Sequence, residues 1–337
     1  MPALGNRVLT TTQDEILPAV VDTILNSNVF ATRMLGVAKK WNGEQIKQAV
    51  KVSKNATGIS FSGFDTFSTN ATNNRVLLSY FPKFYQISVA LPLDELSANQ
   101  TDAKVVDLAA VEMSGAAHDM ADDIGTLLYS DGTGNSSKDF NGLTNIIGTT
   151  GNIGGQSRGT YTTLQSTVTA SGGTLTLALM QTLYNAIASG SQKPTLGLCP
   201  EAVFNLYEQL LNPQERITKD VPMMKRGLEG GSGFTALFFR GVPILSDEKA
   251  TTETLFFVNE NYLDFYALPM ATTEAIKFKS SEIKGNDYSS VLGLGFSWSG
   301  WIKPSNQAAV VGHIYLGGEL VTFNPKRHGR LTGITGV

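Results

Sequence analysis

The segment 99–142 constrains the fold most, because it joins one long helical pattern to an abrupt stop. Its first residues offer side-chain oxygens that cap a helix N-terminus. Apolar side chains then recur at steps of three and four residues, on one helical face: Val106, Ala109, Met113, Ala116, Met120, Ile124 and Leu127. A continuous helix over 101–129 would be about 45 Å long at about 1.5 Å per residue. It ends in a run rich in Gly, Asn, Ser and Asp, which is typical of a turn.

The overall charge argues against a protein whose whole surface binds nucleic acid. The chain of 337 residues has a formal charge of −3 and is long enough for one large core or two modest ones. Charged residues make up 16% of it, against about 25% in ordinary soluble domains. A low charge suits a chain that buries surface against copies of itself, but it equally suits an exterior rich in Thr, Ser and Asn.

The chain has a single cysteine, Cys199, so we expect no internal disulfide. The first residues lack the charged-then-apolar pattern of a signal peptide, and no run of 18 apolar residues predicts a membrane span. Cys199 and the three histidines show no metal-binding spacing. The sequence therefore predicts no metal, no cofactor and no membrane contact.

Residues 41–92 are predicted to form a long two-stranded excursion. Residues 46–53 alternate in polarity and form the outgoing strand, and Tyr85–Leu91 alternate in the same way and form the returning strand. The polar stretch between them, 55–74, carries three aromatic side chains: Phe61, Phe64 and Phe67. Exposed aromatic residues are a liability on a monomer, so we expect this tip to pack on a partner.

The remaining chain predicts a mixture of helices and strands, as in α+β domains. Helices are expected over 12–27, 174–189 and 200–211, and loops over 149–173 and 212–233. Strands are expected over 195–199, 235–239, 242–245, 255–259, 263–267, 275–279, 291–303 and 308–323, followed by a basic tail over 324–330.

Several of these stretches, taken together, resemble the major capsid proteins of tailed phages with the Hong Kong 97 fold. The resemblance is carried by Leu127–Gly134 after the long helix, Gly142–Ile147, Tyr85–Leu96 before the helix, and the pair Phe239–Ser246 and Thr254–Phe265. It extends from about residue 41 to 325, with the order of elements kept.

The resemblance implies an α+β, Hong Kong 97-like capsid fold with four parts. An N-terminal arm covers 1–40, and an extended β-hairpin, the E-loop, covers 41–94. A peripheral domain with the long spine helix covers 95–165 and 296–337, and an α+β axial domain covers 166–295. The arm and the hairpin would both reach neighbouring subunits, although an ordinary core helix at the N-terminus fits the pattern equally well.

The function implied by the resemblance is that of a major capsid protein. Many copies would form pentamers and hexamers of an icosahedral phage head around double-stranded DNA, contacting the DNA only weakly and non-specifically. The other implied partners are a portal and, in some relatives, scaffolding or decoration proteins, with assembly in the host bacterial cytoplasm. Met1 lies 40 residues before the hairpin, so we expect a separate scaffolding protein or none. An encapsulin-type bacterial compartment is the alternative within the same fold.

A charge pattern marks candidate contacts between subunits. Residues 100–131 carry a net charge of −6, and residues 33–54 carry a net charge of +5. Two solvated faces are the simpler interpretation, but a hairpin lying over a neighbour's spine helix would bring opposite charges together. The candidate contact residues are Lys47, Lys51, Lys54, Phe61, Phe64, Phe67, Asp119, Asp122 and Asp123.

A serine esterase is a remote alternative that depends on Ser157. Residues 155–159 match the Gly-x-Ser-x-Gly pattern of a nucleophile elbow. That elbow needs a strand before it and a helix directly after it, whereas both flanks here read as loop. Asp131 begins a calcium-loop-like pattern, but Gly142 stands where the last ligand should be a Glu. We therefore expect no catalytic residue and no metal ligand.

Overall fold

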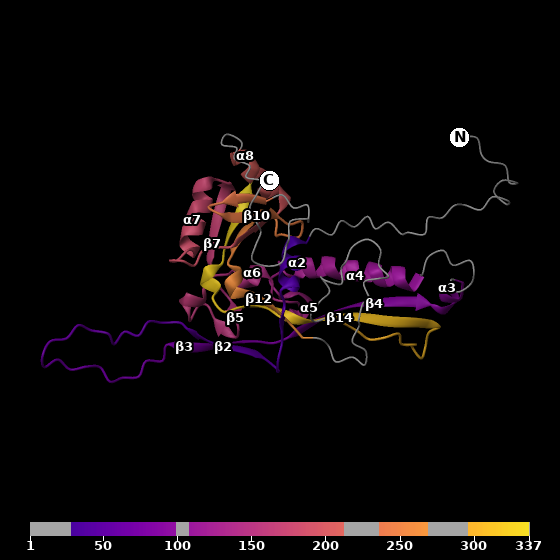
Figure 1. The fold of residues 1–337 in the computed structure, drawn as a ribbon, viewed down its shortest axis with the longest axis horizontal. Coiled ribbons are helices and arrows are strands. Elements are labelled where there is room, and N and C mark those ends of the chain that lie inside the picture. Colours follow the sequence, from indigo (N-terminus) through magenta and orange to yellow (C-terminus); the bar gives the residue numbers. More distant parts are fainter. Residues whose placement is uncertain (1–27, 99–107, 212–235, 269–295, 337) are drawn as a thin grey trace.

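Two mixed β-sheets and one long helix form the body of the molecule (Figure 1). The structure, a computed structural model, describes residues 28–98, 108–211, 236–268 and 296–336. The predicted helix over 12–27, the loop over 212–233 and the strand over 275–279 lie outside these residues.

The five-stranded sheet is built around its longest strand, β14 (Ala309–Thr322). Strand β4 (Lys83–Pro92) pairs with β14 in antiparallel register over ten residue pairs. Strands β12 (Leu263–Ala267) and β13 (Phe296–Trp298) also pair with β14, and the short β1 (Lys39–Lys40) pairs in parallel with β12. The long β4–β14 ladder extends from the body of the molecule in the direction opposite to the hairpin (Figure 1).

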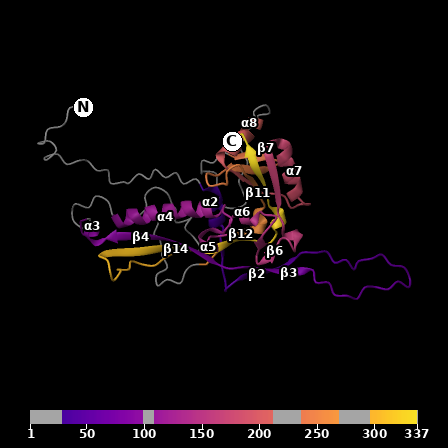
Figure 2. The same cartoon turned by 180° about the vertical axis from the view of Figure 1, so that it is seen from behind.

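Helix α4 (Leu108–Leu127) lies along β4, and both views of the ribbon show them side by side (Figures 1 and 2). It is preceded by α3 (Leu93–Ala98), and residues 99–107 are not described. The predicted helix is therefore confirmed from Leu108 onward, and it ends two residues earlier than expected. Met120 and Ile124 are fully buried beneath it, as the apolar stripe predicts.

The six-stranded sheet has the order β7-β15-β11-β8-β10-β9. Its strands are β7 (Thr167–Thr174), β8 (Leu196–Cys199), β9 (Ala236–Phe239), β10 (Val242–Ser246), β11 (Leu255–Val258) and β15 (Gly329–Thr335). Helices α7 (Leu177–Ile187) and α8 (Glu201–Leu211) share one apolar core with it. Thr176 caps α7 by accepting a hydrogen bond from the Leu179 N–H at 3.2 Å. The helices predicted over 174–189 and 200–211 are therefore confirmed.

The hairpin exists, but its predicted returning strand is wrong. Strand β2 (Ile46–Lys51) pairs with β3 (Arg75–Tyr80), not with Tyr85–Leu91. Residues 85–91 belong to β4, where Val89 and Leu91 are buried and the alternate positions are exposed. Their alternating pattern therefore marks one face of the five-stranded sheet, because any half-buried strand has the same period.

The predicted loop over 149–173 is also wrong in part. It contains the hairpin β5 (Asn152–Ile153) and β6 (Gln156–Ser157), the short helix η1 (Thr162–Leu164) and most of β7. Strand β7 pairs on one side only, with β15, so it is an edge strand. An edge strand tolerates the Thr, Ser and Gly residues that made this stretch resemble a loop.

The segment before the hairpin packs into the subunit. Helix α2 (Val29–Gly36) buries Val29, Phe30 and Met34 in the same core as α4. The short helices α5 (Gly134–Ser137), α6 (Leu143–Ile146), η3 (Glu260–Tyr262) and η5 (Pro325–Arg327) complete the described elements.

Sheet pairing does not follow the predicted division of the sequence in every strand. Strand β12, within 166–295, pairs in the five-stranded sheet, and β15, within 296–337, pairs in the six-stranded sheet. The arm over 1–40 and the domain boundaries stay predictions.

Candidate assembly surfaces

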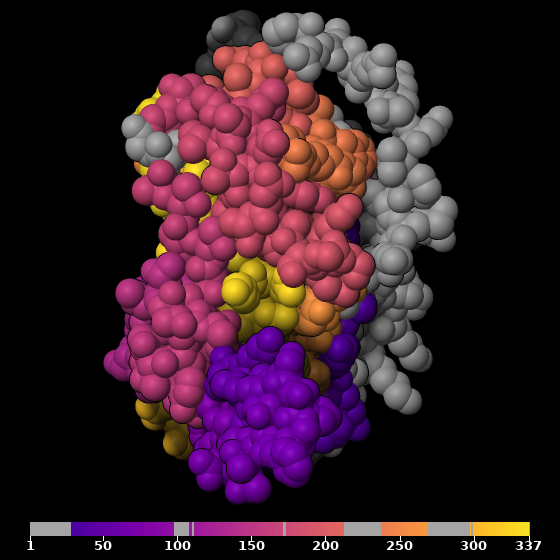
Figure 3. Space-filling model, turned by 90° about the vertical axis from the view of Figure 1, so that its left-hand side faces the viewer, coloured from indigo at the N-terminus to yellow at the C-terminus, as the bar shows by residue number. Residues whose placement is uncertain are grey.

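The tip of the hairpin is an exposed aromatic surface. Residues 52–74 contain no helix or strand. The exposed fractions of Phe61, Phe64 and Phe67 are 67%, 104% and 60%. The rings of Phe61 and Phe67 meet edge to face, with 5.1 Å between their centroids. Figure 3, which faces the tip, shows these N-terminal residues in indigo at the lower end of the molecule. The tip thus presents aromatic surface to solvent in a single subunit.

The basic residues of the hairpin lie on its strands and just beyond them. Lys47 and Lys51 point to the same side of β2, because side chains alternate along a strand, and Arg75 of β3 is the ladder partner of Lys51. Both lysines are exposed, as is Lys54. These residues form a small basic face beside the aromatic tip.

Two other cations of the basic segment have partners inside the subunit. The Arg33 guanidinium pairs with the buried carboxylate of Glu260 at 2.9 Å, and the Lys39 ammonium lies 2.6 Å from a carboxylate oxygen of Asp264. The positive charge available to contact a neighbour is therefore smaller than the net charge of +5 counted over residues 33–54.

The three acidic candidates of helix α4 differ in their surroundings. Asp122 forms an ion pair with Lys249 at 2.8 Å, and Asp123 accepts a hydrogen bond from the Tyr85 hydroxyl at 2.5 Å. Asp119 is exposed. Within one subunit the hairpin and α4 extend to opposite sides of the body (Figure 1), so the structure does not bring the basic and acidic candidates together.

A cavity of about 290 Å³ opens at the base of the hairpin. Its walls include Tyr80 from β3, Lys83 from the start of β4, Asn145 from α6, Gly154 from the turn between β5 and β6, and Glu319 from β14. The aromatic ring of Tyr80 belongs to the apolar cluster beneath the hairpin, and its hydroxyl donates to the Thr322 carbonyl at 2.6 Å. The cavity therefore lies where the hairpin leaves the body.

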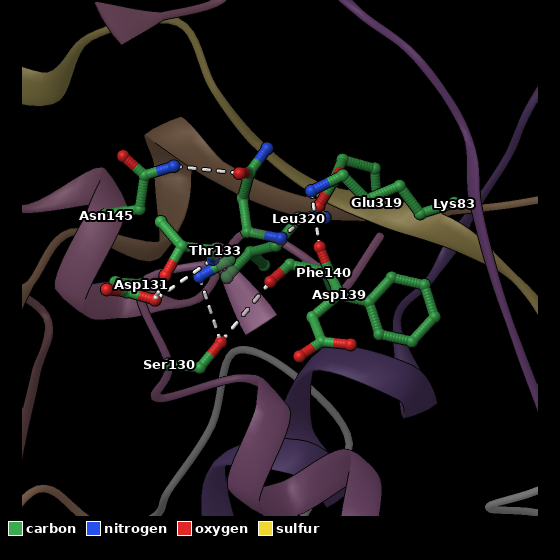
Figure 4. A network of polar contacts seen from close by, with 11 residues as sticks. Lys83, Ser130, Asp131, Thr133, Asp139, Phe140, Asn145, Glu319 and Leu320 are labelled. Carbon is green, nitrogen blue, oxygen red and sulfur yellow. Dashed lines mark hydrogen bonds and ion pairs between the residues drawn. The ribbon is translucent and has the colours of Figure 1, made fainter. Parts of the chain in front are cut away.

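Glu319 is the buried ionisable group of this cavity, with an exposed fraction of 1%. Its Oε1 accepts hydrogen bonds from the backbone N–H groups of Asn141 at 2.6 Å and of Leu320 at 3.1 Å. The Lys83 ammonium lies 3.7 Å from Oε2 and donates to the Asp139 carbonyl (Figure 4). Burial raises the pKa of Glu319 to about 7, although Lys83 and the two N–H groups act to lower it.

Sequence reasoning missed this group. The available signal was a single acidic residue inside the apolar run Leu316–Phe323, where a charge is rare unless it is paired.

The turn after α4 is held by its own side chains. Asp131 Oδ1 accepts from the N–H and the hydroxyl of Thr133, at 3.0 and 2.7 Å (Figure 4). These bonds hold the pKa of the Asp131 carboxyl below its usual value. Asn135, Ser136 and Ser137 follow with positive φ angles of 50°, 60° and 65°. The Asp131 pattern is thus a turn, as the sequence analysis expects.

Ser157 does not have the geometry of a nucleophile elbow. It is exposed on the two-residue strand β6, and its hydroxyl accepts from the Gly159 N–H at 3.2 Å. No α-helix follows it directly. Among the described residues, His, Cys, Asp and Glu side chains do not gather in any group of three that could hold a metal ion. None of the helices described here has both the length and the hydropathy needed to cross a bilayer.

No family model matches the sequence, and no curated protein matches it. Comparison with solved structures does find similar proteins. A chain of the cyanophage A-1(L) capsid is 14% identical, with a TM-score of 0.74, and the match covers 98% of this chain and all of that one. A chain of the native GTA particle capsid is 10% identical, with a TM-score of 0.63 and coverage of 99% and 100%.

The third similar structure is a chain of the holo-SrpI encapsulin complex from Synechococcus elongatus. It is 12% identical, with a TM-score of 0.60, and the match covers 99% of this chain and 96% of that one. At these identities the likeness concerns the fold. The resemblance predicted from the sequence is thereby confirmed at that level: this chain has the α+β fold of phage capsid proteins.

Proposed function

We propose that this chain is the major capsid protein of a tailed phage, which assembles into the icosahedral head that encloses double-stranded DNA. The observation that carries the proposal is the aromatic hairpin tip, exposed on a subunit that has a capsid fold. Its three phenylalanine rings are the kind of surface that soluble monomers avoid and that subunit interfaces bury. The role is structural, and the proposal assigns no catalytic step to any residue.

The aromatic and basic side chains of the hairpin indicate where it packs in the shell. The tip lies over a neighbouring subunit as an E-loop, with the rings of Phe61, Phe64 and Phe67 against the neighbour's apolar surface. Lys47, Lys51 and Lys54 lie over the acidic face of a neighbouring spine helix, where Asp119 and Asp123 are exposed and Asp122 already pairs with Lys249 of its own subunit. Complementary charge of this kind sets the register of association more than its strength.

Purified protein examined by electron microscopy tests the proposal. Closed shells of uniform size are the expected result, and a monodisperse monomer of about 36 kDa at high concentration would contradict it. Ser157→Ala serves as the matched control for the remote esterase alternative, because a hydrolase activity lost in that variant would favour an enzyme.

An encapsulin-type compartment is the second candidate, favoured by the likeness to the holo-SrpI encapsulin. The contents of particles isolated from their natural source separate the two. A phage head contains double-stranded DNA, whereas an encapsulin contains a cargo protein bound to the inner wall. A phage head would also include a portal, and scaffolding or decoration proteins would co-purify with assembling or mature particles. The proposed location is the virion, after assembly in the host cytoplasm.

A further inference from the structure

Glu319 occupies an unusual position, because it is buried and yet borders a cavity. One carboxylate oxygen accepts two backbone N–H groups, but the other, Oε2, has no hydrogen-bond partner among the described residues. The nearest cation is the Lys83 ammonium, 3.7 Å from Oε2, which is beyond hydrogen-bond distance. A negative charge at this site is therefore only partly compensated when the structure is closed.

Three segments of the chain meet at this carboxyl group. Glu319 itself belongs to β14, Asn141 belongs to the turn that follows α4, and Lys83 begins β4. Lys83 is separated from the last residue of the hairpin, Tyr80, by Phe81 and Pro82 alone. The carboxyl thus connects the end of the hairpin and the turn to the central strand of the sheet (Figure 4).

We propose that Glu319 is a proton-sensitive latch at the base of the hairpin, closed when its carboxyl is protonated and opened more often when it ionises. The cavity gives water and protons access to the group. In the open state water hydrates the carboxylate, whereas in the closed state the carboxylate is poorly hydrated. Opening also releases the Asn141 N–H and the Lys83 ammonium from the carboxylate. The hairpin would then pivot more freely on the body.

The direction of the effect follows from proton linkage. Burial raises the pKa of Glu319 to about 7 in the closed site, whereas an ordinary glutamate has a pKa of 4.5. The closed state therefore holds the proton more tightly than an open state in which water reaches the carboxyl. Closure is favoured below about pH 4.5, weakens as the pH rises to about 7, and changes no further above that; the open fraction increases by at most about tenfold per pH unit.

The other charged and titratable groups around the site act as follows. Lys83, on β4, lowers the pKa of Glu319. Tyr80, on β3, has a pKa raised further above its usual value by burial, so its phenol stays protonated. Asp139, in the turn after α4, contributes its backbone carbonyl to Lys83, and Tyr266 of β12 is the ladder partner of Glu319.

Hydrogen exchange on the full-length chain tests the latch. The amides of Asn141 and Leu320 and the peptide over 75–84 are followed from pH 5 to pH 8, after correction for intrinsic exchange. In the wild type, the opening equilibrium should rise by up to about tenfold per pH unit between pH 5 and 7 and then level off. Glu319→Gln should remove this dependence, and Glu44→Gln, at an exposed site before the hairpin, should keep it.

Lys83→Met provides the second test, in case Glu319→Gln fails to fold. Without the ammonium the pKa of Glu319 rises further, so the transition should move to higher pH. An identical pH dependence in wild type and Glu319→Gln, or an unmoved transition in Lys83→Met, would overturn the proposal. The measurement does not need assembled shells, so its outcome is independent of the proposed capsid function.

Discussion

The Arg33 guanidinium and the Glu260 carboxylate form a two-point hydrogen-bonded ion pair inside the subunit, with both N–O distances at 3.0 Å. Both side chains are buried, with exposed fractions of 7% and 9%. Arg33 lies on α2 and Glu260 on η3, and the Thr195 hydroxyl adds a third contact at 3.2 Å. The pair therefore ties the segment before the hairpin to the region between the two sheets.

Arg33→Met should destabilise the subunit by about 3–5 kcal/mol, because it leaves the Glu260 carboxylate buried without its cation. Urea denaturation followed by circular dichroism measures the change. The double variant Arg33→Met, Glu260→Gln should lose markedly less, since no buried charge is left alone. If both variants lost the same free energy, the packing of the arginine stem and not the charge would explain the cost.

Gly142 allows a prediction about the turn that ends the spine helix. A Cβ at this position would lie 2.4 Å from the Ser130 carbonyl oxygen and 2.7 Å from that of Leu127. Because both obstacles are backbone atoms, Gly142→Ala should cost at least about 1–3 kcal/mol, the range of an overpacked site.

Gly115→Ala is the matched control for that substitution. Gly115 lies within α4, and nothing stands within 4 Å of its would-be Cβ. Alanine there should stabilise the subunit by about 0.5–1 kcal/mol, because glycine is a poor helix former. Thermal unfolding of the two variants should therefore shift in opposite directions, and a shift in the same direction would contradict this account.

The sequence predicts elements well where one local pattern decides the structure. Helices α4, α7 and α8 and the strands around β11 and β12 are recognisable because apolar spacing alone distinguishes a buried face. Pairing partners are less predictable, because strands β3 and β4 have the same alternating period. Strand β3 pairs with β2 in the hairpin, whereas β4 pairs with β14, which lies far away in the sequence. Strand β7 was missed because an edge strand needs little apolar surface.

The candidate contacts were predictable as residue types but not as an interface. The exposed phenylalanines follow from their polar surroundings in the sequence. The partners of Arg33 and Asp122 do not, because Glu260 and Lys249 lie more than a hundred residues away and only folding brings them near. Glu319 was missed for the same reason: its raised pKa comes from burial among segments that are distant in the chain.

His328 gives a prediction about stability in acid. It is fully buried, accepts a hydrogen bond at Nδ1 from the Asn259 N–H at 3.3 Å, and has a pKa lowered by burial to about 3, from 6.5. The unfolded chain binds a proton at this residue before the folded chain does. Its contribution to stability is therefore present above pH 6.5 and falls by up to about 1.4 kcal/mol per pH unit as the pH drops toward 3.

His328→Gln should lower the free energy of unfolding at pH 7. The difference in this free energy between the variant and the wild type should become smaller as the pH falls. Urea denaturation of both proteins at pH 6.5, 5.5 and 4.5 checks this. The comparison must be between variants, because Glu319 shifts stability in the opposite direction over part of this range. A stability difference between His328→Gln and the wild type that stays constant over this pH range would contradict the prediction.

The basic face of the hairpin should govern how fast subunits associate. Replacing Lys47 and Lys51 by Glu should slow assembly by roughly tenfold at low salt, and by less at high salt, because screened charges steer encounters poorly. Light scattering measures the rate. Adding Asp119→Lys should restore part of it if these charges meet across the interface. Lys303→Glu, at an exposed site outside the hairpin, is the control. If that variant assembled equally slowly, the net charge of the subunit and not the basic face of the hairpin would explain the effect.

The aromatic tip should decide whether shells are stable. Replacing Phe61, Phe64 and Phe67 together by Ser should leave the subunit folded, because all three rings are exposed and none belongs to the apolar clusters of the body. Shell formation or the melting temperature of the particle should fall, since burying a phenylalanine against a neighbour contributes about 1.5–3 kcal/mol. Circular dichroism of subunits and electron microscopy of particles read the two effects separately.

Hydrogen exchange shows whether the tip becomes ordered by assembly. Residues 55–74 are rich in Asn, Ser, Thr and Gly, and fixing a backbone costs about 1–2 kcal/mol per residue. In a free subunit, nothing described in the body covers the rings to offset that cost. These amides should therefore exchange fast in free subunits and slowly in shells, while those of β2 and β3 stay protected in both. Equal protection of the tip in both states would mean that the hairpin is ordered without a neighbour, and the interface proposed for it would fail.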